Sequence, residues 1–181
     1  MAELEAEIAV LIREFRAKTG KLLTIGAVES ATGGRIADRI TNVPGSSDYF
    51  KGSVVAYSNE VKITLLGVNK TTIENYGAVS EQTALEMALG GRRLLNVDIC
   101  VSDTGIAGPA GGTPEKPVGL FYLGLATEDT SFSQTYILPG NRGGNKRDAA
   151  EATLSMLKQY LLRCIEAEGH GANIEPHVAQ H

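Results

Sequence analysis

The sequence has no tryptophan, only two cysteines and only three histidines, and these shortages exclude several kinds of chemistry. Cys100 and Cys164 are too few and too far apart for a disulfide framework or a zinc site, and we interpret both as small buried apolar residues. The histidines His170, His177 and His181 all fall close to the carboxyl terminus. A Ser-His-Asp triad on the folded body is therefore disfavoured.

Long apolar runs and an excess of basic residues are also missing. No run approaches the roughly 20 apolar residues that cross a bilayer, and the acidic start MAELEAE differs from the basic start of a signal peptide. The 17 Lys and Arg against 21 Asp and Glu give a net charge of -4, without the basic stripe typical of nucleic-acid binding. We therefore expect a cytoplasmic protein that binds neither membranes nor nucleic acid.

Familiar phosphate-binding and metal-binding motifs are absent as well. There is no GxxxxGK[ST], and the spacing of Gly105, Gly108, Gly111 and Gly112 differs from GxGxxG, which argues against Walker-type and Rossmann-type nucleotide binding. The acidic residues show no metal-ligand spacing: Glu29, Asp38, Asp48, Asp98 and Asp103. We expect no metal and no cofactor.

What the sequence does contain is an alternation of helical and strand patterns. Apolar periodicity and short apolar runs predict helices over the first 18 or so residues and over 32–42, 58–66 and 80–95, a last long helix, and strands over 21–28, 49–57, 98–103, 118–127 and 131–138. The last two strands are expected to form a hairpin. This order predicts an α/β fold: a single-domain three-layer sandwich with a mixed β-sheet flanked by helices. We assign residues 1–165 to this domain and 166–181 to a flexible tail.

Four glycine-rich polar turns punctuate this pattern. They read ESATGG at 29–34, PGSS at 44–47, DTGIAGP at 103–109 and PGNRGG at 139–144. Glycine lets the backbone approach a ligand and present its N–H groups, while Ser and Thr add short polar arms. Turns that follow parallel strands meet at the edge of the sheet where ligands usually bind. The pattern indicates one polar pocket for a small anionic molecule.

Ser30 and Lys62 are the candidates for nucleophilic chemistry. Ser30 lies between a strand and a helix, where a nucleophilic serine is presented in several hydrolases and helix N–H groups can stabilise an oxyanion. The alternative is that Ser30 only caps the helix. A base is then needed, and a lysine kept neutral by burial and by nearby cations would serve. Lys62 follows Tyr57 closely enough to lie on the same side of the fold as Tyr57. The alternative is that Lys62 is a solvated surface lysine.

Other basic residues could meet an anion. Arg142, Lys146 and Arg147 open the last helix, where cations oppose the helix dipole, so either an anion lies between them or they form a basic surface turn. Lys116 in the third glycine-rich turn could meet a phosphate instead.

Several long segments together resemble one known family. AVESATGGRIADRITNVPGSSDYFKGSVVAYSNEVKITLLGV, YGAVSEQTALEMA and DTGIAGPAGGTPEKPVGLFYLGLA are similar to the C-terminal domain of the CinA (competence/damage-inducible) family, from about residue 5 to residue 163. The stand-alone members of that family include nicotinamide-nucleotide amidases. The chain lacks the N-terminal molybdopterin-binding-like domain of full-length CinA proteins, so the resemblance implies a stand-alone version.

The resemblance implies metal-independent hydrolysis of nicotinamide mononucleotide to nicotinate mononucleotide and ammonia, and a homodimer or larger homo-oligomer. It implies that Ser30 is the nucleophile, Lys62 the base and Tyr57 an aid to proton transfer or amide orientation. Backbone N–H groups of the Thr32–Gly34 turn would stabilise the oxyanion. The substrate, a small-molecule nucleotide, would be held by the remaining family positions: Thr32, Gly33, Gly34, Ser47, Asn59, Thr104, Gly105 and Arg142.

The sequence departs from the family pattern at two places. Ala31 stands where the family commonly has cysteine, and the loop around Arg142 reads GNRGGNKR where the family often has G-x-R-E-x-V-R. These departures leave open an alternative function: a catalytically inactive nucleotide-binding or regulatory module that keeps the pocket. A structural partner in DNA uptake or repair is a third possibility, and no basic surface pattern supports it.

Overall fold

A computed structural model describes residues 3–171. Its elements are, in chain order, α1 (Leu4–Thr19), β1 (Ile25–Glu29), α2 (Arg35–Thr41), a 3-10 turn (Ser46–Asp48), β2 (Phe50–Val55), α3 (Asn59–Leu66), α4 (Lys70–Tyr76), α5 (Glu81–Leu95), β3 (Ile99–Gly105), β4 (Leu120–Ala126), β5 (Ser131–Ile137) and α6 (Arg142–Gly171). None of the helices within these described residues is long and apolar enough to cross a membrane.

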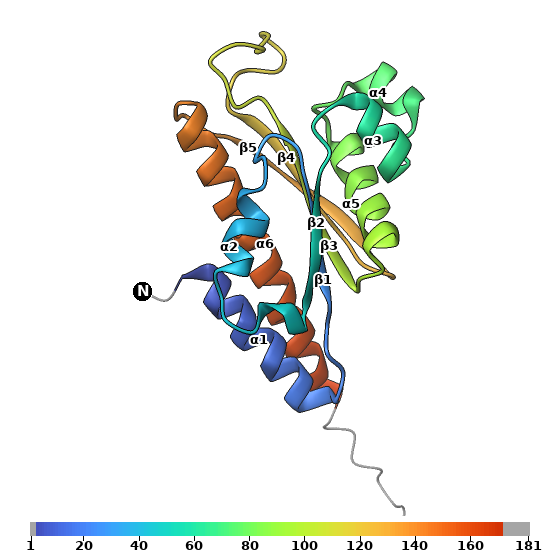
Figure 1. Cartoon of the computed structure of the whole chain (residues 1–181), viewed down its shortest axis with the longest axis vertical. Coiled ribbons are helices and arrows are strands. Elements are labelled where there is room, and N and C mark those ends of the chain that lie inside the picture. The colour runs from blue at the N-terminus through green and yellow to red at the C-terminus, as the bar shows by residue number, and fades with distance from the viewer. Residues whose placement is uncertain (1–2, 172–181) are drawn as a thin grey trace, which may run out of the picture.

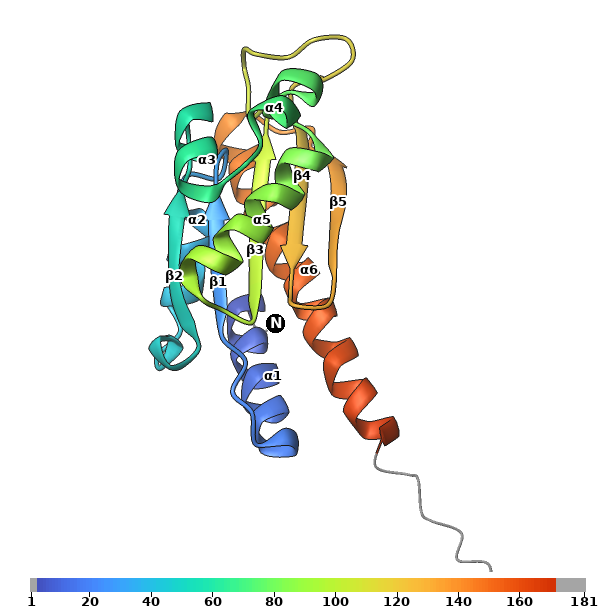
Figure 2. The same ribbon diagram turned by 90° about the vertical axis from the view of Figure 1, so that its right-hand side faces the viewer.

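The strands form one five-stranded sheet in the order β2-β1-β3-β4-β5. β1 pairs in parallel with both β2 and β3, whereas β4 runs antiparallel to β3 and β5. Helices α1, α2 and α6 cover one face, and α3, α4 and α5 lie on the other (Figures 1 and 2). The expected three-layer sandwich with a mixed sheet is therefore confirmed.

The two faces of the sheet bury different parts of the hydrophobic core. The larger part fills the space under α1, α2 and α6 and includes Ile12, Ile36 and Leu157. The smaller part lies under α3 and α5 and includes Leu66 and Cys100. Because both faces of β1 and β3 are covered, these strands are buried along nearly their whole length, which explains their unbroken apolar runs.

Most elements match the sequence-based expectation, and the differences are at boundaries. β1 begins four residues later than predicted, at Ile25, and α2 begins at Arg35 rather than Thr32 because the intervening glycines adopt positive φ angles. The predicted hairpin is β4 and β5. α4 was missed, since its sequence KTTIENY has little apolar periodicity. α6 continues to Gly171, past the predicted domain end at residue 165, and residues 172–181 of the predicted tail lie outside the described residues.

The fold brings several chain reversals to one edge of the sheet. Ser30 follows the carboxyl end of β1, Ala56 follows that of β2, and Thr104 and Gly105 end β3. β5 runs in the same direction, so the segment that leads into α6 reaches this edge too. A ligand site at the carboxyl ends of the strands follows from this topology.

Candidate active site

Ser30 and Lys62 meet at the carboxyl end of β1. Lys62 Nζ lies 3.0 Å from Ser30 Oγ, and both side chains are buried. Lys62 Nζ also donates hydrogen bonds to the backbone carbonyls of Ala56, at 2.8 Å, and Tyr57, at 3.2 Å. The nitrogen is thus held by two carbonyl acceptors and faces the serine hydroxyl with its remaining position, which is the geometry needed for proton exchange between them.

The local sequence explains how Lys62 comes to be placed there. Ser58 caps α3 by accepting a hydrogen bond from Val61 N–H, so Lys62 falls on the first turn of that helix. α5 then packs directly against the end of α3 at Gly90. A Cβ built on Gly90 would lie 1.9 Å from the carbonyl oxygen of Leu66, so only glycine permits this approach.

Burial alters the acid–base properties of Lys62. Its side chain is only 2% exposed, and this desolvation lowers its pKa, an effect that a negative charge on Asp103 would partly oppose. A lysine with a lowered pKa holds a larger neutral fraction near pH 7, and only the neutral amine can accept a proton. The surface-lysine alternative for Lys62 is therefore wrong.

Two buried carboxyl groups hold the turn that carries Ser30. Asp103 accepts hydrogen bonds from the backbone N–H groups of Ser30, at 3.0 Å, and Thr32, at 3.1 Å. Glu29 accepts from the N–H groups of Gly34 at 2.8 Å, Ile36 at 3.1 Å and Ala37 at 2.9 Å. Both carboxyl side chains are completely buried. These hydrogen bonds fix the position of the turn that carries Ser30.

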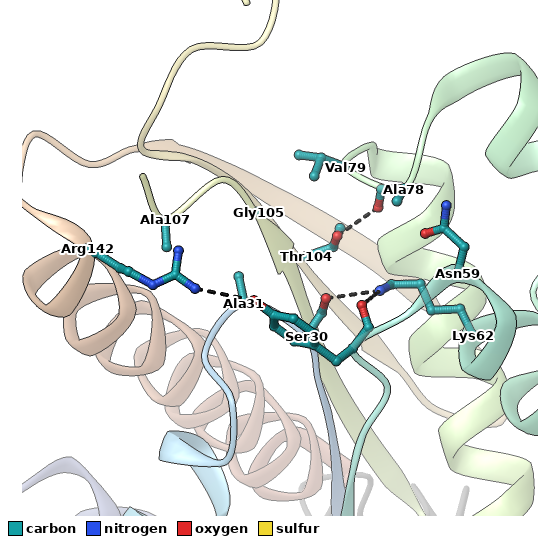
Figure 3. Close-up of a pocket in the computed structure, with 11 residues that line it drawn as sticks. Ser30, Ala31, Asn59, Lys62, Ala78, Val79, Thr104, Gly105, Ala107 and Arg142 are labelled. Carbon is teal, nitrogen blue, oxygen red and sulfur yellow. Dashed lines mark hydrogen bonds between the residues drawn. The ribbon is translucent and has the colours of Figure 1, made fainter. Parts of the chain in front are cut away.

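A cavity of about 190 Å³ opens above the serine. Its other side chains come from distant segments: Ala31, Tyr57, Asn59, Ala78, Val79, Thr104, Gly105, Ala107 and Arg142. Figure 3 shows Lys62 and Arg142 reaching toward Ser30 from opposite sides. The Arg142 guanidinium donates to the Gly108 carbonyl at 2.8 Å and to the Tyr57 hydroxyl at 3.2 Å. The cavity therefore combines a buried amine, a hydroxyl and a fixed positive charge.

A second hollow adjoins the first. It has a volume of about 610 Å³ and is lined by Pro109, Val118 and the start of α6, and it shares Ala107 and Arg142 with the first cavity. Arg142 thus stands at the boundary between the two spaces. A ligand with one end at Ser30 can extend past Arg142 into this hollow.

No group of three His, Cys, Asp or Glu side chains suitable for a metal ion occurs among the described residues. The acidic side chains nearest Ser30 are occupied by backbone N–H donors, as described above.

Comparison with known proteins identifies the family. The model of the CinA C-terminal domain matches residues 7–161, which is most of the chain. The chain belongs to the CinA C-terminal domain family. This CinA domain is 56% identical over 149 residues to a putative competence-damage inducible protein of Halothermothrix orenii, covering 78% of this chain and 36% of that one. It is 47% identical over 159 residues to a CinA-like protein of Kosmotoga olearia, covering 88% and 37%.

Solved structures of the same superfamily share the fold. Competence/damage inducible protein CihA from Agrobacterium tumefaciens is 34% identical with a TM-score of 0.80, covering 90% of this chain and 97% of that chain. A CinA superfamily protein from Enterobacter cloacae is 25% identical with a TM-score of 0.80, covering 87% and 90%. The CinA domain spans only about a third of the length of the curated relatives. The names of these relatives refer to competence and damage, not to a reaction.

The structure brings most of the predicted site residues of the CinA domain together. Ser30, Tyr57, Asn59, Lys62, Thr104, Gly105 and Arg142 all line the cavity. The Tyr57 side chain is 63% exposed and its hydroxyl contacts Arg142, while its backbone carbonyl is what binds Lys62. Thr104 Oγ1 donates to the Ala78 carbonyl at 2.7 Å, so its hydroxyl proton is not available to a ligand in this arrangement.

Four predicted residues lie elsewhere. Ser47 belongs to the 3-10 turn that precedes β2, so it sits at the amino end of a parallel strand, opposite the cavity. Thr32, Gly33 and Gly34 are absent from the cavity lining. The N–H groups of Thr32 and Gly34 donate to Asp103 and Glu29. Because buried carboxyl groups occupy them, these two N–H groups are not available to an oxyanion, contrary to the expectation.

Lys116 and Arg147 make protein contacts, and neither they nor Lys146 line the cavity. Lys116 Nζ donates to the carbonyl of Tyr76, at 2.5 Å, and to that of Val79, at 2.7 Å, so the phosphate role considered for it is not supported. Arg147 pairs with Asp148 at the surface. Of the three cations near the start of α6, Arg142 is the one that lines the cavity.

Sequence reasoning missed the buried residues that support the backbone of the site. Glu29 and Asp103 were considered only as metal ligands, and Asn145 was not considered. Asn145 is fully buried, donates to the Ala107 carbonyl at 3.1 Å and accepts from Gly140 N–H at 2.8 Å. The available signal was an acidic residue at the end of an otherwise apolar strand, in AVES and in CVSD, because such a charge is buried only with a dedicated partner.

Proposed function

We propose that this CinA domain hydrolyses the carboxamide of nicotinamide mononucleotide to give nicotinate mononucleotide and ammonia. The observation that carries the proposal is the 3.0 Å contact between Ser30 Oγ and the buried Lys62 Nζ. The identity of the substrate rests on the resemblance to the nicotinamide-nucleotide amidases of the family. Ser30, Lys62 and Tyr57 are the proposed catalytic residues.

The reaction proceeds through two acyl-transfer steps. Ser30 Oγ attacks the carboxamide carbon while neutral Lys62 accepts the hydroxyl proton. The tetrahedral intermediate collapses, the C–N bond breaks, and Lys62 returns that proton to the departing nitrogen, which leaves as ammonia. Water then attacks the ester carbon, giving a proton to Lys62. The bond to Ser30 Oγ breaks, the serine takes up the proton, and the carboxylic acid is released.

The developing oxyanion needs N–H donors that are free to face the cavity. Ile106 N–H donates to Leu120 on β4. Because N–H directions alternate along a strand, Gly105 N–H points away from β4, toward the end of β1. A Cβ on Gly105 would lie 2.4 Å from the Phe121 ring, so glycine is required there. We assign Gly105 N–H, together with that of Ala31, to the oxyanion.

Arg142 supplies the positive charge that would bind the phosphate of the substrate. Its guanidinium stands between the cavity above Ser30 and the adjoining hollow. With the carboxamide at Ser30, the phosphate would lie in that hollow, where a guanidinium is a strong partner for it. Asn59 and Tyr57, which also line the cavity above Ser30, would then flank the pyridine ring and ribose.

The direct test is ammonia release from nicotinamide mononucleotide by the purified protein. We expect Ser30→Ala to lower kcat by about 10³-fold or more, because the nucleophile is lost, while the variant still binds the substrate. Ser131→Ala, which removes an exposed hydroxyl at the start of β5, is the matched control and should turn over like the wild type.

Two results would count against this function. Binding of the mononucleotide without ammonia release by the wild-type protein would favour the regulatory-module alternative. Near-normal turnover by Ser30→Ala would exclude the acyl-enzyme route. The family resemblance also leads us to propose a cytoplasmic homodimer or larger homo-oligomer, which sedimentation analysis of the purified protein tests.

A further inference from the structure

The Thr32 hydroxyl lies between the two buried carboxyl groups behind Ser30. Thr32 Oγ1 is 2.7 Å from Glu29 Oε2 and 2.5 Å from Asp103 Oδ1. All three side chains are completely buried. Each of the two contacts is short enough to require a proton between its oxygen atoms.

One hydroxyl proton cannot serve both contacts. A threonine hydroxyl has one hydrogen to donate, and an ionised carboxylate can only accept. If Glu29 and Asp103 were both ionised, one contact would bring two lone pairs together inside the protein, which is strongly unfavourable. The geometry therefore requires one additional proton in the chain that runs from Glu29 through Thr32 to Asp103.

The donors around each carboxyl group show where that proton resides. Glu29 accepts three backbone N–H groups and the Ser53 hydroxyl in addition to its contact with Thr32. Asp103 accepts only two backbone N–H groups. More donors favour the charged form, so Glu29 is the carboxylate and Asp103 the acid. Burial raises the pKa of Asp103 to about 6, and the charge on Glu29 adds to this effect.

The count of donors and acceptors can be repeated for Lys62, the amine that faces Ser30. Two of its three partners are carbonyls, which accept, and the third is the Ser30 hydroxyl, which can donate. A neutral amine satisfies all three by donating twice and accepting once. The proton absent from a neutral Lys62 is the additional proton that the chain from Glu29 to Asp103 requires. A charged Lys62 with two ionised carboxylates and a neutral Lys62 with one protonated carboxyl group therefore differ only in the position of one proton.

We infer that Asp103 holds this proton and donates it to Thr32, which donates to Glu29, and that Lys62 is thereby left as a neutral amine facing Ser30. Asp103 is in this account a positioning residue: it holds the Ser30 turn by two N–H groups and withholds the negative charge that would favour a lysine ammonium. The charged and titratable groups that face it are Glu29 and Lys62, and the residue opposite it on β4 is Leu123. The catalytic consequence rests on the proposed function, but the proton assignment does not.

Infrared difference spectroscopy of the protein without substrate at pH 5, below the pKa of Asp103, tests the assignment. We expect a carbonyl stretching band of a buried carboxylic acid that shifts when aspartate is labelled with ¹³C at its side-chain carboxyl carbon. The band should disappear in Asp103→Asn. It should persist in Asp98→Asn, the matched control, because hydrogen bonds from Thr24 and the nearby Lys21 overcome burial and hold the pKa of Asp98 below its usual value. It should also persist in Lys62→Met.

Absence of an aspartic acid band in the wild type would overturn the inference, and this result remains available even if Asp103→Asn fails to fold. Where the variant folds, the acidic limb of kcat/KM should stay near its wild-type position in Asp103→Asn, since a protonated Asp103 already leaves the pKa of Lys62 unraised, and a clear move to lower pH would contradict the inference. A protein that shows the band but releases no ammonia keeps the proton assignment and refutes the proposed function. An active protein that lacks the band refutes the proton assignment and keeps the proposed function.

Discussion

At the scale of single residues, Arg142 is expected to contribute to substrate binding more than to the chemical step. Its guanidinium lies at the boundary of the two hollows and on the far side of the cavity from Lys62. We predict that Arg142→Ala raises KM for nicotinamide mononucleotide by about tenfold or more with a smaller effect on kcat, because a charge-assisted contact of about 1.5–3 kcal/mol is lost. The riboside, which has no phosphate, should be affected much less, and steady-state kinetics on both substrates measures this. Arg147→Ala is the control, as Arg147 pairs at the surface with Asp148. Equal losses on both substrates would contradict the assignment.

At the scale of elements, the packing of α5 against α3 sets the position of Lys62. The close approach depends on Gly90, where a Cβ would lie 1.9 Å from the Leu66 carbonyl oxygen. Backbone atoms cannot yield as a flexible side chain can, so Gly90→Ala should push α3 away. We predict a loss of about 1–3 kcal/mol in unfolding free energy and a larger loss of kcat than of substrate affinity. Gly169→Ala, where nothing lies within 4 Å, is the matched control for denaturation and kinetics. Unchanged kcat in Gly90→Ala would show that α3 tolerates the shift.

At the scale of the whole molecule, an ion network ties the helices of one layer together. Arg39 on α2 pairs with Glu5 on α1, at 2.6 Å, and with Glu151 on α6. Burial acts to raise the pKa of Glu5, but the hydrogen bonds and charge of Arg39 outweigh it and hold that pKa below its usual value. A lowered carboxyl pKa adds stability that is present above the unfolded-state value and is lost as the pH falls through the folded-state value. Arg39→Gln should lower the unfolding free energy by about 1–3 kcal/mol at pH 7, and the difference from wild type should shrink under acidic conditions. Chemical denaturation across this pH range checks the result, with Arg147→Gln as control, and a difference independent of pH would refute it.

Much of this organisation follows from the sequence, and the exceptions have physical reasons. Apolar runs and glycine-rich turns predicted the sheet and the edge at which Ser30 and Lys62 meet. Ser47 was misplaced because a polar turn looks the same before a strand as after one, and only the topology assigns it to an end. The roles of Glu29 and Asp103 depend on three-dimensional contacts between β1 and β3, which residue spacing does not reveal.

The most direct test of the account is to look for the covalent intermediate on Ser30. Protein mixed with nicotinamide mononucleotide, quenched rapidly with acid and analysed by mass spectrometry should carry the mass of the substrate less ammonia on the peptide that contains Ser30. Ser30→Ala should carry no adduct and release no ammonia. Steady ammonia release by the wild type with no adduct at any quench time, together with undiminished release by Ser30→Ala, would contradict the account.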